Sequence, residues 1–205
     1  MIARTLETAV HGRYLYDDRG PERLLVGFHG YAETAEIHLA ELEKIPGIER
    51  WSVASVQALH PFYTRSGSIV ASWMTSLDRD LAVADNIAYV RRIMASLGTP
   101  QTVVFAGFSQ GATMAARAAA YAGPAAGLIM LGGDLPPDIH ADPSVVLPPL
   151  LLARGERDDW YTEEKFKKDL SYLEGKAQVK SCVFAGGHEW TDTFRGAAGA
   201  FLAAL

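Results

Sequence analysis

Short apolar and β-branched runs alternate with segments of helical period along most of this chain. Several of the runs are apolar throughout, as expected of strands that are buried on both faces of a sheet. This alternation predicts a single α/β domain over residues 1–205, with a mostly parallel central sheet and helices on both faces. The expected strands are part of an N-terminal hairpin at 14–16 and core strands at 23–28, 51–57, 101–106, 126–131, 149–153 and 179–184.

Apolar residues at helical spacing predict the helices between these strands. One stripe follows Asp78 and Asp80 and stops before Gly98, a residue type that commonly ends helices. A second helix begins at Thr162, and a third lies after residue 190. The apolar positions of the three stripes are Val83, Ile87, Val90, Met94 and Leu97, then Phe166, Leu170 and Leu173, then Phe194, Ala198, Phe201 and Leu205. We expect residues 132–149, which include five prolines, to be irregular.

The composition excludes several classes of protein. The chain has 205 residues, a formal net charge of −5 and one cysteine, so a disulfide framework is not expected. The acidic balance argues against a nucleic-acid partner. No stretch reaches the roughly 18 apolar residues of a membrane span, and no apolar secretory leader is evident, so we expect a cytoplasmic protein without integral membrane association. The sequence does not indicate the oligomeric state.

The strongest local signal is G-x-S-x-G at residues 107–111, between an apolar strand and an alanine-rich segment. A sharp strand-to-helix turn would force Ser109 into a strained conformation, which explains small residues two positions to either side. The N–H of Gln110 would then lie at the start of a helix, where it can donate to an oxyanion. The alternative is a glycine-rich turn with an incidental serine.

A nucleophilic serine needs a histidine base later in the chain. His188 follows the last expected strand, so its loop would lie at the same sheet edge as Ser109. The other candidates have less suitable contexts: His140 lies in the proline-rich stretch, His60 precedes the serine, and nothing catalytic surrounds His11 and His38.

The histidine in turn needs a carboxylate. Asp158 follows the penultimate strand at a G-x-x-D spacing, in which Gly155 makes the turn. Asp159 and Asp134 remain alternatives. A second oxyanion donor is expected from the N–H of Tyr31, after a strand that ends in His-Gly, and His29 would hold that loop through hydrogen bonds.

Four motifs in this chain order resemble the α/β-hydrolase superfamily, and specifically its phospholipase/carboxylesterase branch, which includes the acyl-protein thioesterases. They are His29-Gly30, the turn at 107–111, Gly155-x-x-Asp158 and Gly187-His188. The resemblance spans nearly the whole chain. It implies a serine esterase with little or no lid that uses Ser109, Asp158 and His188, with the Tyr31 and Gln110 amides as its oxyanion hole. The sequence departs from the thioesterase pattern at 31–33, where Tyr-Ala-Glu stands in place of Leu-Gly-Asp. It departs again at 158–161, where Asp-Asp-Trp-Tyr stands in place of Asp-Pro and an apolar residue. The substrate class therefore does not carry over.

Aromatic residues gather near the expected site. Phe108, Trp73, Trp160 and Trp190 would line a compact apolar acyl pocket suited to short or medium chains, or alternatively pack under loops. The predicted function is hydrolysis of a small carboxylic ester or thioester through an acyl-enzyme. The alternatives are a non-catalytic ligand-binding protein on the same scaffold and an acyltransferase with the same nucleophile. No metal or organic cofactor is implied.

Overall fold

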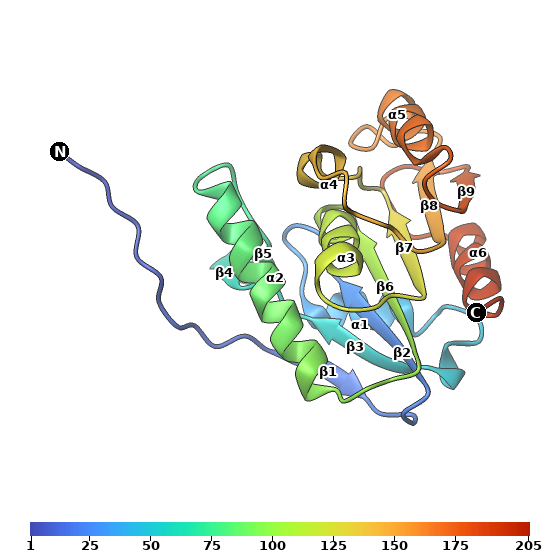
Figure 1. Cartoon of the computed structure of the whole chain (residues 1–205), viewed down its shortest axis with the longest axis horizontal. Coiled ribbons are helices and arrows are strands. Elements are labelled where there is room, and N and C mark those ends of the chain that lie inside the picture. Colours follow the sequence, from blue (N-terminus) through green and yellow to red (C-terminus); the bar gives the residue numbers. More distant parts are fainter.

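The central sheet contains seven strands in the order β1-β3-β2-β6-β7-β8-β9 (Figure 1). A computed structural model of the chain describes residues 1–205. All neighbouring strands are parallel except β1, which is antiparallel to β3, so the mostly parallel sheet is confirmed. The strands are β1 (Tyr14–Asp17), β2 (Arg23–Phe28), β3 (Ser52–Val56), β6 (Thr102–Phe108), β7 (Gly127–Leu131), β8 (Leu150–Gly155) and β9 (Val179–Phe184).

Helices cover both faces of this sheet, as predicted (Figure 1). Alternate residues of β2 show the division: Leu24 and Val26 belong to one buried cluster and Leu25 to the other. Helices α2, α3 and α5 pack on the first face, and α1 and α6 on the second. The helices are α1 (Ala35–Leu42), α2 (Arg79–Ser96), α3 (Gln110–Tyr121), α4 (Pro137–Ala141), α5 (Glu163–Leu173) and α6 (Asp192–Leu202), with a 3-10 turn at Ile48–Arg50. None of them has the length and apolar character needed to cross a bilayer.

The predicted N-terminal hairpin is wrong. Strand β1 pairs with β3, not with β2, which follows it in the chain. Both edges of β2 are already occupied by parallel partners, β3 and β6, so β1 finds its hydrogen bonds one strand further out. The hairpin in the structure is instead formed by β4 (His60–Tyr63) and β5 (Ile69–Ser72), which the sequence analysis missed. The expected irregular stretch 132–149 also contains α4.

The turn between β6 and α3 depends on two glycines. Ser109 has φ 55° and ψ −120°, a strained conformation for a residue other than glycine. A Cβ at Gly107 would lie 2.1 Å from the carbonyl oxygen of Gly111, and one at Gly111 would lie 1.9 Å from the carbonyl oxygen of Phe28. Strand β2 and the start of α3 therefore approach each other more closely than any side chain allows.

The helix α1 carries a histidine that is fully buried. Both ring nitrogens of His38 lack a hydrogen-bond partner, and burial lowers the pKa of this imidazole to about 3. The edge of the Trp190 ring lies against it, with ring centroids 5.6 Å apart. His38 is therefore a neutral packing residue whose desolvated nitrogens weaken the fold.

We predict that Gly111→Ala lowers the free energy of unfolding by ~3 kcal/mol or more, because its methyl group must displace the backbone of β2. Gly196→Ala is the matched control, since it lies in α6 with open space around its Cα and should gain up to ~1 kcal/mol from helix propensity. Urea denaturation of both variants is the measurement. Equal stabilities would show that the contact with β2 is not tight.

We predict that His38→Leu removes a pH dependence of stability. Below the ordinary histidine pKa of 6.5 the unfolded chain binds a proton that the folded chain, with a pKa of about 3, does not. The wild type therefore loses stability as the pH falls from 6.5 towards 3, by about 2 kcal/mol at pH 5 from this group alone. Denaturant unfolding at pH 7.5 and pH 5 should show a smaller loss in the variant. Identical losses in both proteins would contradict the buried neutral imidazole.

Candidate active site

Ser109 lies at the carboxyl end of β6, directly before α3. Its backbone N–H donates to the carbonyl oxygen of Leu131 at 2.8 Å, which ties the turn to the neighbouring strand β7. Gln110 is the first residue of α3, so its N–H has no acceptor within the helix and lies at the positive end of the helix dipole. The Gln110 side chain accepts from the N–H of Trp73 and donates to the carbonyl of Met74, both at 2.8 Å. The segment after β5 is thereby fastened to the serine turn.

The loop after β2 is held by a buried histidine. Nε2 of His29 accepts from the N–H of Ala58 at 3.0 Å, so the proton is assigned to Nδ1, which donates to the carbonyl of Gly30 at 2.7 Å. Burial lowers the pKa of His29 and favours this neutral form. Both ring nitrogens are thus occupied in holding the loop, as expected. The N–H of Tyr31 makes no hydrogen bond within the chain.

Glu33 is a residue of this loop that the sequence analysis missed. Its Oε2 accepts from the N–H of Gly30 at 2.7 Å. Burial raises the pKa of the carboxyl, and this hydrogen bond opposes the shift in part. Glu33 therefore helps fix the backbone that presents the Tyr31 amide. The only signal in the sequence is an acidic residue three positions after Gly30, where the thioesterase pattern has Asp.

Asp158 and His188 come together from the loops after β8 and β9. Nδ1 of His188 and Oδ2 of Asp158 are 2.9 Å apart, and the Asp158 side chain is 1% exposed against 20% for His188. The two loops can approach because Gly155 has no side chain: a Cβ there would lie 2.2 Å from the carbonyl oxygen of Gly187. Gly132 has the same role against the imidazole, with a Cβ position 2.9 Å from Cε1 of His188.

The alternative acids and bases lie elsewhere. Asp159 is exposed, and the nearest partner of Asp134 is Nζ of Lys165 at 3.9 Å. His140 belongs to the short helix α4, and its Nε2 lies 3.5 Å from Oδ1 of Asp169. His11 and His60 are exposed, and His38 is the buried histidine of α1.

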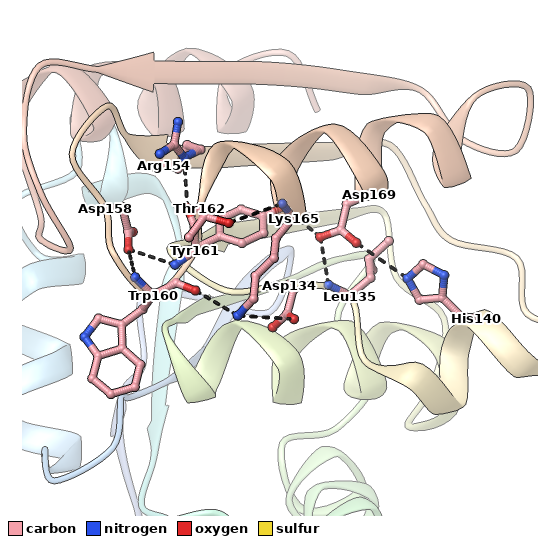
Figure 2. A network of polar contacts seen from close by, with 10 residues as sticks. All are labelled: Asp134, Leu135, His140, Arg154, Asp158, Trp160, Tyr161, Thr162, Lys165 and Asp169. Atoms are coloured by element: carbon pink, nitrogen blue, oxygen red, sulfur yellow. Dashed lines mark hydrogen bonds and ion pairs between the residues drawn. The ribbon is translucent and has the colours of Figure 1, made fainter.

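Asp158 is held in place by its own loop and by α5 (Figure 2). Its Oδ1 accepts from the backbone N–H groups of Trp160 and Tyr161, at 2.9 and 2.8 Å. Tyr161 is buried, and its hydroxyl donates to Oδ2 of Asp169 at 2.7 Å. Nζ of Lys165 donates to the carbonyl of Trp160 at 2.8 Å. Side chains from the first two turns of α5 therefore hold the backbone amides that bind the Asp158 carboxylate.

This network contains two groups whose pKa values are raised, Asp169 and Tyr161. Burial raises the pKa of Asp169, although the bond from Tyr161 and the N–H of Leu135 oppose the shift. Burial, followed by the charge of Asp169, raises the pKa of Tyr161. At neutral pH the phenol therefore remains a hydrogen-bond donor, as the observed contact requires.

The cavity at Ser109 is more polar than expected. It has a volume of about 440 Å³, and three of its 14 lining residues are hydrophobic. Of the four aromatic residues predicted to line it, only Trp160 does so, and this side chain is 74% exposed. Trp73 is fully buried in the core, where its Nε1 donates to the carbonyl of His29, so the prediction for this residue is wrong.

Phe108 and Trp190 pack behind the site and do not line the cavity. The rings of Phe108 and His188 lie 4.8 Å apart between centroids, and Trp190 packs on Phe108 at 6.0 Å. The Phe108 ring therefore supports the imidazole of His188 on one side, and Trp190 supports Phe108. Ser109 and His188 make no hydrogen bond in this structure, and the chain holds no group of three or more His, Cys, Asp or Glu side chains arranged to bind a metal ion.

No protein-family model matches this sequence, and no curated protein matches it. Its structure is similar to those of an acyl-protein thioesterase 2 from Zea mays (TM-score 0.74, 19% identity, 95% of this chain and 99% of that chain covered). It is also similar to a Bacillus cereus carboxylesterase (TM-score 0.73, 16% identity, 94% of each chain covered). The esterase PE8 is a third similar structure (TM-score 0.71, 23% identity, 94% of this chain and 97% of that chain covered). The resemblance seen in the sequence is therefore confirmed at the level of architecture: the chain has the α/β-hydrolase fold.

Proposed function

We propose that this chain hydrolyses carboxylic esters or thioesters of small substrates, with Ser109 as nucleophile, His188 as general base and Asp158 as its partner. The observation that carries the proposal is the 2.9 Å contact between the buried Asp158 carboxylate and His188, on loops beside the strained turn of Ser109. The esterases of the same fold support the reaction type.

In the proposed mechanism His188 takes the proton of Ser109 as Oγ attacks the acyl carbonyl carbon. The Asp158 carboxylate accepts a hydrogen bond from Nδ1–H of His188. This bond leaves Nε2 free to act as base and stabilises the imidazolium that forms. The protonated imidazole then gives its proton to the leaving alcohol or thiol, and an acyl-serine remains. Water repeats the sequence, releasing the acid and restoring Ser109.

The oxyanion of each tetrahedral intermediate would be held by two backbone amides. The Gln110 N–H lies at the amino end of α3, and the Tyr31 N–H has no partner within the chain. Both are fixed before substrate arrives, Gln110 through its side-chain bonds to the segment 73–74 and Tyr31 through His29 and Glu33. Such preorganised donors are a large source of rate enhancement.

We predict that Ser109→Ala lowers kcat for p-nitrophenyl butyrate by ~10³-fold or more, because no acyl-enzyme can form. The purified variant should also fail to react with a fluorophosphonate probe, which the wild type should bind at Ser109 as mapped by mass spectrometry. Unchanged thermal unfolding serves as the control for folding. Undiminished hydrolysis in the variant would exclude Ser109 as nucleophile, and probe labelling without turnover would favour the ligand-binding alternative.

We predict that Asp158→Asn lowers kcat by about 10⁴-fold, because the amide NH2 can donate to Nδ1 of His188, and the proton then lies on Nε2, the nitrogen that must act as base. Asp159→Asn is the matched control: it is the adjacent residue, it is exposed, and its substitution should leave kcat within about twofold. Steady-state kinetics of the two variants with one ester decide the assignment. The reverse pattern would make Asp159 the acid.

A further inference from the structure

The cavity at Ser109 contains a buried arginine with unused donors. Arg117 lies on α3, two turns after Ser109, and its side chain is 4% exposed. Nε and Nη2 bind the two carboxylate oxygens of Asp138, at 2.9 and 2.7 Å. Nη1 has only sulfur acceptors, in Met74 at 3.6 Å and Met114 at 4.0 Å. Thioether sulfur is a weak acceptor, so a charged buried donor group lacks a strong partner.

A second arginine of the same cavity has no counter-ion. Arg79, at the start of α2, forms no ion pair, and its single hydrogen bond runs from Nε to the carbonyl of Thr75 at 3.4 Å. The neighbouring acidic residues Asp78 and Asp80 do not lie within ion-pair distance of it. The Nη atoms of Arg79 are therefore available to a ligand beside the nucleophile.

The balance of charge around the cavity is positive. Three cationic side chains and one anionic side chain line it, namely Arg79, Arg117, Lys165 and Asp134. If Asp138, which neutralises Arg117 from α4, is counted as well, one positive charge remains. The whole chain has a formal charge of −5, so the charge around this cavity is opposite in sign to that of the whole molecule. Cationic cavities concentrate anionic ligands.

We infer that the substrate is an ester that carries an anionic oxygen group, a carboxylate or a phosphate, bound by Arg79 and Arg117 while its carbonyl lies at Ser109. The anion would give Nη1 of Arg117 the oxygen acceptor that the two methionines do not supply, and would pair with the free charge of Arg79. The two Nη atoms of Arg79 can donate two parallel hydrogen bonds to one carboxylate or phosphate, and Nη1 of Arg117, whose other two nitrogens bind Asp138, would add one more donor. The inference rests on the proposed hydrolase function and narrows its substrate class.

The test compares matched esters that differ in one charge. Mono-p-nitrophenyl adipate has a free carboxylate, and its methyl ester is the neutral counterpart of almost equal length. A phosphonate in place of the carboxylate separates the two kinds of anion. We expect kcat/KM for the anionic ester to exceed that for the neutral ester by about tenfold or more, as charge-assisted hydrogen bonds allow, and this ratio to fall in high salt.

Two variants assign the preference to the cavity. Arg79→Gln should lower the ratio of anionic to neutral kcat/KM by about tenfold, since it removes the unpaired charge. Arg92→Gln removes the same charge from an exposed position further along α2 that does not line the cavity, and it should leave the ratio unchanged. Arg117→Lys keeps the charge opposite Asp138 but loses the Nη1 donors, so it too should lower the ratio.

The outcomes separate the inference from the function on which it rests. Ser109-dependent hydrolysis of both esters at equal rates would overturn the inference and leave the hydrolase function standing. An anionic preference that Arg79→Gln and Arg92→Gln change equally would also overturn it, because net charge alone would then be responsible. If neither ester is hydrolysed, both proposals fail. Better use of the phosphonate than of the carboxylate would identify the anion as phosphate-like.

Discussion

The site depends on the close contact between the first turn of α3 and strand β2. Gly111 rests against the carbonyl oxygen of Phe28, and Gly107 rests against Gly111, at distances that exclude a Cβ at either position. This packing over-determines the turn between them and holds Ser109 in a conformation that an isolated chain would rarely adopt. The same contact sets α3 beside the loop after β2, so that the Gln110 and Tyr31 amides belong to one site. Without it, neither Ser109 nor the two proposed oxyanion donors would have a defined position.

The hydrogen bond between Asp158 and His188 depends on several further contacts of the Asp158 loop. Asp158 is nearly inaccessible to water, and burial of a charge is costly unless its oxygens are satisfied. Here two backbone amides and the imidazole supply three donors. The side chain of Tyr161 is bound in turn to Asp169 on α5, which helps hold its amide in place. The geometry of the site is thus secured by a helix that contributes no residue to the proposed chemistry.

The cavity at Ser109 is polar, whereas the sequence suggested an apolar acyl pocket. The aromatic residues near the motifs are mostly committed to packing: Trp73 is bonded to the His29 carbonyl, and Phe108 and Trp190 support the imidazole. The wall that remains is rich in charged groups from α2, α3 and α5. An apolar acyl chain would leave these groups desolvated without partners, which costs free energy, whereas an anionic ligand satisfies them.

The sequence by itself determined the α/β alternation, the position of the turn at Ser109 and the order of the loops that bear Asp158 and His188. These features are local: apolar periodicity specifies strands and helices, and glycines at fixed spacing permit one turn. Only the tertiary structure decided that β1 pairs with β3, that Asp158 rather than Asp159 or Asp134 meets His188, and that Arg79, Arg117 and Lys165 share a cavity. Each of these facts joins segments far apart in the chain, and no local pattern records which face of a loop will be turned inward once the sheet is packed.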